Sequence, residues 1–300
     1  MSRAAQEAAV EIDLAEPGLL TDLMTLTKAR LSLLVIITTF VGFCMASDTS
    51  LDWVRLFHAV VGTTLAAAAA AVLNQRIETR VDRLMERTRN RPLPAGRMKP
   101  AAALVLGIAL GIAGTAWLWL TTNALAASLA AATILIYIAF YTPLKRRTSL
   151  CTIVGAVAGA IPPVIGWTAV QPSIDLGAWV LFGILFTWQM PHFLAIAWMY
   201  RDEYAQAGFV MIRRDDLTGS ATATQSLLYT LALMLITTIP FFAGLNSSLY
   251  LVLGLLLDAA MLVCALRFLF DRTRPTARML FYASIFYLPL ILGLMIFTKA

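Results

Sequence analysis

The chain has 300 residues, of which 60% are hydrophobic and only 13% are charged, and its formal net charge is +6. Soluble domains are roughly 45–50% apolar and about 25% charged, so this composition excludes an ordinary water-soluble protein. It also excludes a disordered chain, which would be poor in aromatic residues and rich in charge. Cys44, Cys151 and Cys264 all lie in apolar runs, so we expect neither a disulfide framework nor a metal site from them. The chain is expected to lie in a lipid bilayer.

Residues 1–27 come before the first apolar run and are rich in acidic side chains. They lack the pattern of a cleaved signal peptide, and their acidity argues against a mitochondrial transit peptide. We therefore expect residues 1–27 to be a cytoplasmic N-terminal segment and residues 28–300 to be a single transmembrane domain.

Nine apolar runs are long enough to span a membrane, because a helix needs about 20 residues to cross roughly 30 Å of hydrocarbon. Backbone polar groups must be satisfied internally in lipid, and no alternating strand pattern is present, so these runs predict helices. The expected fold is an all-α polytopic membrane helix bundle. The predicted spans are 31–47, 56–74, 101–120, 124–143, 150–170, 177–199, 225–245, 248–269 and 279–298.

The basic residues predict an orientation. If the N-terminus is cytoplasmic, all but two of the 23 lysines and arginines fall on the cytoplasmic side, the exceptions being Arg55 and Lys299. This is the bias that the positive-inside rule describes, and it places the C-terminus on the opposite side of a bacterial plasma (inner) membrane. The net positive charge is then a matter of topology, and no nucleic acid is expected as a partner. The long loops share the cytoplasmic side, which favours an active face there.

The first polar motif follows the second predicted span. Asn74, Glu78 and Asp82 are spaced four residues apart. On a helix each such step drifts by about 40°, so the three side chains stay within about 80° of one face. An amide and two carboxylates in a row suit Mg²⁺, a hard cation often held by one or two carboxylates and substrate phosphates.

Two further motifs lie at the same predicted membrane depth. Asp202 and Glu203 follow the sixth span, and Tyr141 and Lys145 lie at the inner end of the fourth. Taken singly, such groups are more often topology signals or ion-pair partners. Together, acids that hold a metal and cations that bind phosphate oxygens favour a diphosphate site.

These motifs resemble the UbiA superfamily of intramembrane prenyltransferases over about residues 25–298. Residues 87–92 (Arg-Thr-Arg-Asn-Arg-Pro) and 189–193 (Gln-Met-Pro-His-Phe) are most similar to the superfamily members that act on haem. The resemblance implies a nine-helix bundle around a central cavity. It also implies transfer of farnesyl from farnesyl diphosphate to the 2-vinyl group of haem b, with addition of water, Mg²⁺ as cofactor and haem b as substrate.

The resemblance also assigns roles to residues. It implies a first Mg²⁺-diphosphate row, a second acidic row, catalytic groups and further substrate-binding groups. The first row is Asn74, Glu78 and Asp82; the second is Asp202 and Glu203; the catalytic groups are Asp82, Glu78, Lys145, Tyr141 and His192; the substrate-binding groups add Arg87, Arg91, Arg146 and Tyr204. The chain departs from the superfamily at Glu78 and Glu203, where aspartate is frequent. It also has no Met-Leu-Pro element after Gly208, so Asp215 and Asp216 receive no role.

Two ionisable residues lie deeper in the predicted spans. On a continuous helix His192 would share a face with Glu203 and lie about 16 Å from it, too far to share a metal ion. On the haem reading, this depth suits an imidazole that ligates or orients haem iron or moves a proton, with a hydrogen-bonded structural histidine as the alternative. Asp258 is a functional hypothesis by its position in the membrane, but no role can be named for it.

An apolar, aromatic wall is expected around the farnesyl chain, because it would keep water from a reactive cation. By location, the candidates are Trp117, Trp119, Trp167, Trp188 and Phe193.

Alternatives remain open from the sequence. Another UbiA-type acceptor would be a hydroxybenzoate, a quinone precursor or a chlorin. A secondary transporter is a different class, but it would need polar groups at mid-membrane in broken helices, whereas these motifs gather at one side. For the haem reading, haem A synthase or a terminal oxidase assembly would be the protein partner that receives the product.

Overall fold

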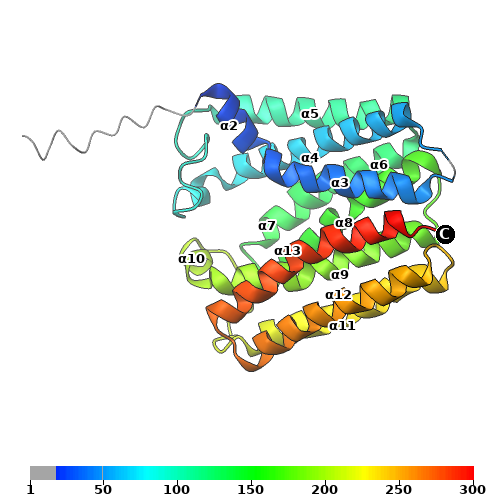
Figure 1. Cartoon of the computed structure of the whole chain (residues 1–300). Coiled ribbons are helices and arrows are strands. Elements are labelled where there is room, and N and C mark those ends of the chain that lie inside the picture. Colours follow the sequence, from blue (N-terminus) through cyan, green and yellow to red (C-terminus); the bar gives the residue numbers. More distant parts are fainter. Residues whose placement is uncertain (1–17, 49) are drawn as a thin grey trace, which may run out of the picture.

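The structure is a computed structural model, and it describes residues 18–48 and 50–300. These residues form an almost entirely helical bundle, with one isolated bridge between Asn246 and Lys299. Eight of the described helices are long and apolar enough to cross a membrane, and Figure 1 shows the long helices running side by side along one axis. The prediction of an all-α polytopic membrane bundle is confirmed.

The nine predicted spans correspond one to one to helices. α3 has the shortest apolar stretch, Ser32–Ala46. The fourth span is composite, since a π-helix, η1, interrupts it. The helices are α3 (Ala29–Ala46), α4 (Trp53–Asp82), α5 (Pro100–Thr121), α6 (Ala124–Leu135) with η1 (Ile136–Tyr141) and α7 (Thr142–Leu144), α8 (Cys151–Val170), α9 (Leu176–Met199), α11 (Ser220–Phe242), α12 (Ser248–Phe270) and α13 (Arg274–Phe297), with the short α2 (Leu19–Leu26) and α10 (Arg201–Gln206).

Polar residues at the turns set where several helices begin. The side chain of Asp52 accepts a hydrogen bond from the backbone N–H of Arg55 at 2.9 Å, at the start of α4. Asn123 does the same for Ala126 at the start of α6. These side chains satisfy backbone donors that have no partner within the helix, so each span starts at a defined residue.

Small residues let the inner helices approach closely. A Cβ added at Gly42 on α3 would collide with the carbonyl oxygen of Pro163 on α8, and one added at Gly166 would collide with that of Thr39. Helices in lipid gain little from hydrophobic burial against each other, so close backbone packing supplies much of their association. The glycines at the contact between α3 and α8 therefore allow the two backbones to pack directly against each other.

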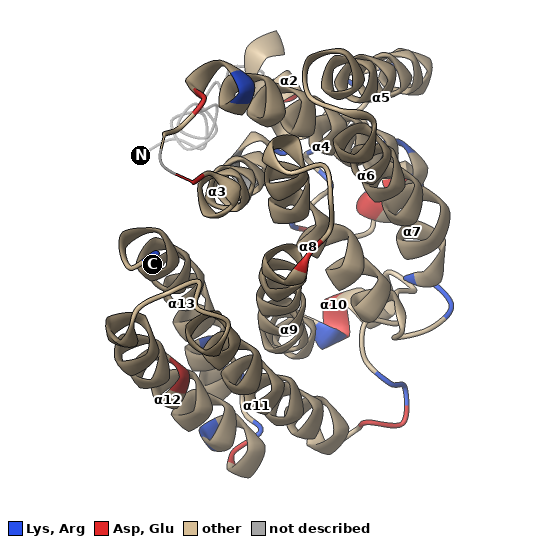
Figure 2. Cartoon of the chain, turned by 90° about the vertical axis from the view of Figure 1, so that its right-hand side faces the viewer, with Lys and Arg blue, Asp and Glu red and all other residues tan. Residues whose placement is uncertain are grey.

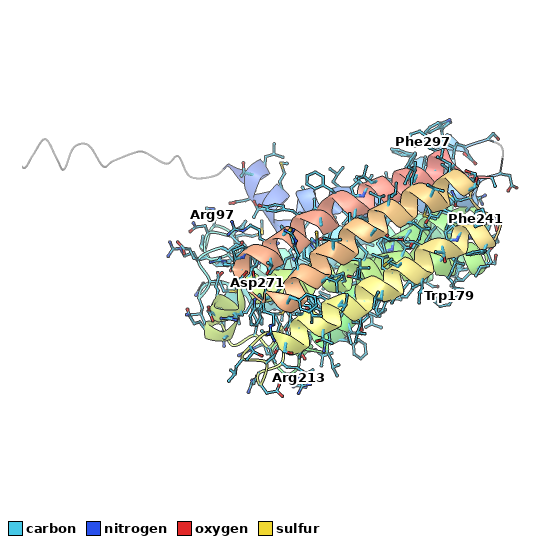
Figure 3. All side chains as sticks on the ribbon, turned by 60° about the horizontal axis from the view of Figure 1, so that its bottom comes forward. Arg97, Trp179, Arg213, Phe241, Asp271 and Phe297 are labelled. Atoms are coloured by element: carbon cyan, nitrogen blue, oxygen red, sulfur yellow. The ribbon has the colours of Figure 1, made fainter. Side chains whose placement is uncertain are left out.

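Charge and apolar surface are separated along the bundle. Figure 2 looks at the bundle from one end and shows mostly uncharged ribbon, with few charged residues. In Figure 3, Arg97, Arg213 and Asp271 lie at one end, and Trp179, Phe241 and Phe297 lie toward the other. Large apolar side chains remain exposed on the outer helices, which suits a surface solvated by lipid. Examples are Leu120, Leu235, Phe242, Val252 and Leu256.

The end of the predicted N-terminal segment packs on the bundle. In α2, Asp22 is ion-paired with Arg97 at 2.8 Å, and Leu26 is fully buried. Gln75 of α4 donates hydrogen bonds to the carbonyls of Thr25 and Leu26, at 3.1 and 2.7 Å. Residues 19–26 are thus attached to α4. Residues 1–17 lie outside the described part of the chain, and the boundary at residue 28 stays a prediction.

Candidate active site

A cavity of about 630 Å³ opens among α3, α4, η1, α8, α9 and α13. This volume falls in the range of roughly 300–1,000 Å³ that is typical of small-molecule sites. Most of the residues singled out from the sequence line it, although they come from four separate parts of the chain. They are Asn74, Glu78, Asp82, Arg87, Arg91, Tyr141, Lys145, His192 and Tyr204.

The acidic row lies on the last turns of α4, which continues eight residues beyond the predicted span to Asp82. Asn74, Glu78 and Asp82 are all buried, and all three face the cavity, as their four-residue spacing predicts. A helix end that carries three buried polar groups needs partners for them, since unpaired buried charge is strongly unfavourable.

Each member of the row has a cationic partner. Lys28 Nζ donates to Asn74 Oδ1 at 3.2 Å. Lys145 Nζ lies 2.9 Å from Glu78 Oε1, and Arg91 Nη1 lies 2.7 Å from Asp82 Oδ2. The polar end of the cavity therefore contains alternating acids and cations, the arrangement that binds an anion and its counter-cation together.

Lys28 reaches the row through an unusual backbone conformation. Among the described residues other than glycine it alone has a positive φ, at 52°. This left-handed geometry is uncommon for a residue with a side chain, and it turns the chain sharply between α2 and α3. Sequence reasoning counted Lys28 only as a topology signal, and nothing in the pattern distinguished it from other basic residues before a span.

Tyr141 is the last residue of the π-helix η1, and Lys145 lies just after α7. Lys145 Nζ lies 4.5 Å from the centroid of the Tyr141 ring, a cation–π distance. Gly155 of α8 makes room for that ring, because a Cβ there would come within 2.8 Å of it. Burial alone would lower the pKa of Lys145, but Tyr141 and Glu78 outweigh it and raise the pKa, so the ammonium stays charged. π-helical turns are frequent at functional sites. This one ends at Tyr141, and Lys145 follows one turn later, so both groups line the cavity.

The second acidic motif is placed differently from the expectation. α9 ends at Met199 and α10 begins at Arg201, so the continuous helix assumed between His192 and Glu203 was wrong. The Asp202 side chain is 86% exposed and lies 3.6 Å from Arg201. Glu203 Oε1 reaches the backbone N–H of Arg87 at 3.5 Å, a long hydrogen bond.

Three of the expected residues thus lie outside the cavity lining: Arg146, which is exposed, Asp202 and Glu203. Among the described residues no three His, Cys, Asp or Glu side chains come together as a ready metal cluster. Tyr200 and Tyr204, which flank the second motif, do line the cavity.

The α4 row nevertheless fits an oxygen-coordinated cation. Oε1 of Glu78 is buried and accepts no hydrogen bond from any described residue, although the Lys145 ammonium is near. Amide and carboxylate oxygens on one face match the ligands of Mg²⁺, which keeps several waters and shares phosphate oxygens. The row suits a metal ion that binds together with a phosphate group. The lysine and arginine side chains that now pair with the row could then pair with the phosphate oxygens instead.

The far end of the cavity is apolar and aromatic. His192 of α9 lies there with Trp188, Phe193 and Phe281. Of the candidate wall residues, Trp188 and Phe193 line the cavity. Trp117 and Trp119 of α5 are exposed, and Trp167 is buried but does not line the cavity. Phe281 of α13 was not anticipated, because an aromatic residue in an apolar span carries no distinguishing signal.

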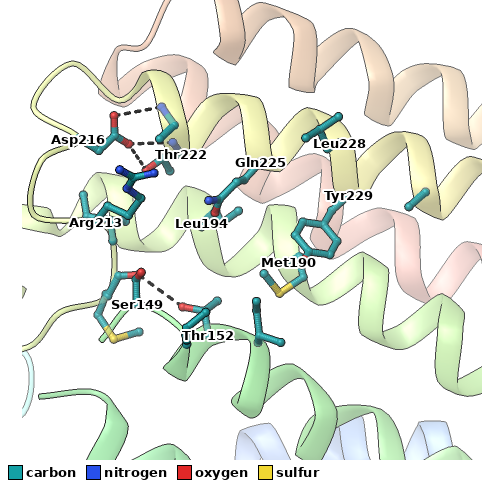
Figure 4. A pocket seen from close by; sticks show the side chains of 16 residues that line it. Ser149, Thr152, Met190, Leu194, Arg213, Asp216, Thr222, Gln225, Leu228 and Tyr229 are labelled. Carbon is teal, nitrogen blue, oxygen red and sulfur yellow. Dashed lines mark hydrogen bonds between the residues drawn. The ribbon is translucent and has the colours of Figure 1, made fainter. Parts of the chain in front are cut away.

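A second, smaller cavity of about 370 Å³ lies among α8, α9, α11 and the preceding loop. Figure 4 shows Arg213 and Asp216 at one end and Tyr229 with Met190 toward the other. Asp216 accepts hydrogen bonds from the backbone N–H groups of Ala221 and Thr222, at 3.1 and 2.8 Å, so it caps the start of α11. None of the predicted site residues lines this cavity, which places the candidate chemistry in the larger one.

Residues 35–290 match the UbiA prenyltransferase family. The chain belongs to the UbiA prenyltransferase family. Over 287 residues it is 42% identical to the protoheme IX farnesyltransferase of Solibacter usitatus, covering 93% of this chain and 98% of that protein. Membership in a prenyltransferase family sets aside the transporter alternative.

Solved UbiA-type structures share the fold. A structure of digeranylgeranylglyceryl phosphate synthase superposes with a TM-score of 0.79 at 16% identity, covering 93% of this chain and 98% of that one. A UbiA homologue from Archaeoglobus fulgidus bound to GPP and Mg²⁺ has a TM-score of 0.66 at 12% identity, covering 91% and 99%. At these identities the likeness concerns the arrangement of the helices, which confirms the UbiA bundle.

Proposed function

We propose that this UbiA-family chain transfers a farnesyl group from farnesyl diphosphate to the 2-vinyl group of haem b, with addition of water, giving haem O and diphosphate. The observation that carries the proposal is the polarity of the cavity, with paired acids and cations at one end and aromatic rings around a histidine at the other. The similarity to a protoheme IX farnesyltransferase over nearly its full length supports haem as the acceptor.

The polar end would hold the diphosphate. Asn74, Glu78 and Asp82 are the residues that would hold Mg²⁺, as proposed from the sequence. When bound, Mg²⁺ would supply neutralising charge for the departing diphosphate. Lys145 and Arg91, released from Glu78 and Asp82, would then donate to the phosphate oxygens. The Archaeoglobus fulgidus homologue, which is bound to GPP and Mg²⁺, supports a metal-dependent prenyl diphosphate site.

The reaction balances without a redox partner. The bond between farnesyl C1 and oxygen breaks, and its electron pair leaves with diphosphate. The π electrons of the vinyl group form the new carbon–carbon bond to C1. Water adds to the resulting cation next to the porphyrin and releases one proton. Trp188, Phe193 and Phe281 would keep bulk water away and tolerate the passing positive charge.

The remaining predicted residues are assigned to the cavity mouth. Tyr204 lines it, and Arg87 brings its backbone N–H toward Glu203. We propose that Arg87, Tyr204 and Glu203 meet the diphosphate from this side. Asp202 and Arg146 are exposed, and we propose that they act through their charge at the same mouth.

The protein spans its membrane many times, and we propose that this is a bacterial inner membrane with a cytoplasmic N-terminus. The bias of the basic residues toward one predicted side supports that orientation, by the positive-inside rule. Arg97 and Arg213 lie at one end of the bundle in Figure 3. In this orientation the diphosphate end of the cavity faces the cytoplasm. Haem A synthase or a terminal oxidase assembly is the proposed recipient of the product.

The test is direct. Membranes containing the protein are incubated with haem b, farnesyl diphosphate and Mg²⁺, and the pigments are analysed by mass spectrometry. We expect haem b to gain the mass of a farnesyl group and one hydroxyl group, and we expect the product to disappear when Mg²⁺ is chelated. Prenylation of a hydroxybenzoate, quinone precursor or chlorin in place of haem would overturn the acceptor and leave the prenyl transfer standing.

A further inference from the structure

Ser284 of α13 is fully buried against the aromatic end of the cavity and makes hydrogen bonds through both its side chain and its backbone. Its Oγ donates to the carbonyl oxygen of Phe281 at 2.6 Å, one turn earlier in the same helix. It also lies 2.8 Å from Nδ1 of His192. Its backbone carbonyl accepts the indole N–H of Trp188 at 2.7 Å.

We assign the tautomer of His192 from this network. A serine hydroxyl has one proton to donate, and here the carbonyl of Phe281 receives it. With the hydroxyl proton on that carbonyl, Oγ accepts from His192, and this assignment puts the imidazole proton on Nδ1. In a neutral imidazole the other nitrogen, Nε2, is then an unprotonated acceptor with a free lone pair.

The same surroundings set the orientation of the ring. Trp188 stacks on the imidazole with centroids 5.1 Å apart and planes 24° apart. Phe281 lies 4.9 Å away with its plane tilted by 32°. Ser284 therefore fixes one nitrogen, and the two aromatic rings restrict rotation. Nε2 makes no hydrogen bond to any described residue, and the ring borders the cavity.

A lone pair on Nε2, with Nδ1–H hydrogen-bonded behind it, is the arrangement that histidine uses when it binds a metal. Here it is the only imidazole in the described cavity lining, since His58 lies elsewhere, and none of the three cysteines lines the cavity. The ring is at the aromatic end, away from the acidic row that suits Mg²⁺. The metal that this geometry suits is the iron of an apolar macrocycle.

We propose that Nε2 of His192 is the axial ligand of the haem iron in the acceptor complex, and that Ser284 is the positioning residue that holds the imidazole in the ligating tautomer. The inference rests on the proposed function and deepens it. Ligation at this end would fix the acceptor relative to the diphosphate end, where the farnesyl group ionises.

The test uses the purified full-length protein in detergent with ferric haem b, and it reads the axial ligand by optical absorption and electron paramagnetic resonance. We expect the wild type to show imidazole ligation. We expect His192→Gln to lose it and His192→Gly to regain it when free imidazole is added. His58→Gln is the matched control, because it removes the other of the two histidines and lies outside the cavity.

Ser284 is tested by the same spectra and by haem titration. Loss of such a supporting hydrogen bond lowers metal affinity by about 10–100-fold, so we expect that weakening for Ser284→Ala. Ser284→Thr, which keeps the hydroxyl, should retain most of the affinity. Farnesyl diphosphate binding, measured on every variant, should stay at the wild-type value and shows that the variant is folded.

Several results would overturn the inference. A wild-type complex without a nitrogen ligand on iron would do so without any variant. Unchanged spectra and affinity in His192→Gln or in Ser284→Ala would also do so. These outcomes are separable from the proposed function. If haem b is farnesylated while iron has no imidazole, the inference alone fails; if imidazole ligation is seen but another acceptor is prenylated, the proposed function fails.

Discussion

The two acidic motifs at the polar end of this UbiA bundle use the same residue types in opposite surroundings. Glu78 and Asp82 are buried on a 30-residue helix and are held by Lys145 and Arg91. Asp202 and Glu203 are on a six-residue helix after a break, and Asp202 is largely exposed. A charge fixed in a water-poor site does electrostatic work that an exposed, mobile charge does not. We therefore propose that α4 supplies the preorganised charges of the candidate site.

The largest expected effect is the loss of turnover when one acidic residue of the α4 row is replaced. Asp82→Ala should lower kcat by about 100–1,000-fold, the loss typical of removing one preorganised electrostatic group. The measurement is haem O formation by mass spectrometry, with thermal unfolding of the purified protein as the control for folding. Normal turnover would show that the row has no part in catalysis.

The next effect is on stability and comes from splitting a buried pair. Lys145→Met leaves the Glu78 carboxylate without its partner, and breaking such a pair is destabilising by about 3–5 kcal/mol. The double variant Glu78→Gln/Lys145→Met removes both charges and should regain much of that stability while staying inactive. Thermal unfolding of the two single variants and the double variant completes the cycle. Purely additive losses would mean that the pair does not interact.

A buried acid outside the cavity provides the next contrast. Asp258 of α12 accepts hydrogen bonds from Thr237 of α11 and Tyr287 of α13, both at 2.6 Å, and does not line the cavity. Asp258→Leu leaves the Tyr287 hydroxyl unpaired, which destabilises by about 1–3 kcal/mol. We expect a lower unfolding temperature with unchanged KM for both substrates. A changed KM would connect this network to the site.

A smaller effect is expected at the second motif. Asp202→Asn should change kcat/KM by less than about fivefold, because exposed charge pairs contribute about 0.2–1 kcal/mol. Glu203→Gln should lose more, since its carboxylate reaches the loop beside the cavity. A loss of activity in the Asp202 variant as large as that in the Asp82 variant would contradict the contrast between α4 and α10. It would indicate that α10 moves toward the cavity when substrate binds.

The smallest effect concerns pH. The pKa of Lys145 is raised in the folded protein, so the native state holds this proton more tightly than the unfolded chain. The stabilisation is therefore complete below the unfolded pKa of about 10.4 and is lost only above it, as pH rises through the folded pKa. Farnesyl diphosphate affinity should show no loss from Lys145 between pH 7 and 10. A lysine titration with a midpoint inside that window would contradict the ion pair.

Much of this arrangement follows from local sequence rules. Span length and the absence of charge predicted the helices, and the four-residue spacing of Asn74, Glu78 and Asp82 predicted their shared face. The break at Tyr200 was not predicted, because no proline or glycine marks it. Contacts between distant segments were also out of reach. Ser284 is one small polar residue in an apolar span, and its pairing with His192 depends on how α13 packs against α9.

The loop after α10 is fastened to the first half of the site. The backbone N–H of Val210 donates to the carbonyl of Lys145 at 2.6 Å, and Thr152 Oγ1 donates to the carbonyl of Met211 at 3.4 Å. Gly208, with φ at 77°, lies just before this anchorage. The chain therefore turns at Gly208, and the residues after the turn are held by hydrogen bonds to Lys145 and Thr152. The backbone of this loop is therefore tied directly to the residue that carries the ammonium group paired with Glu78.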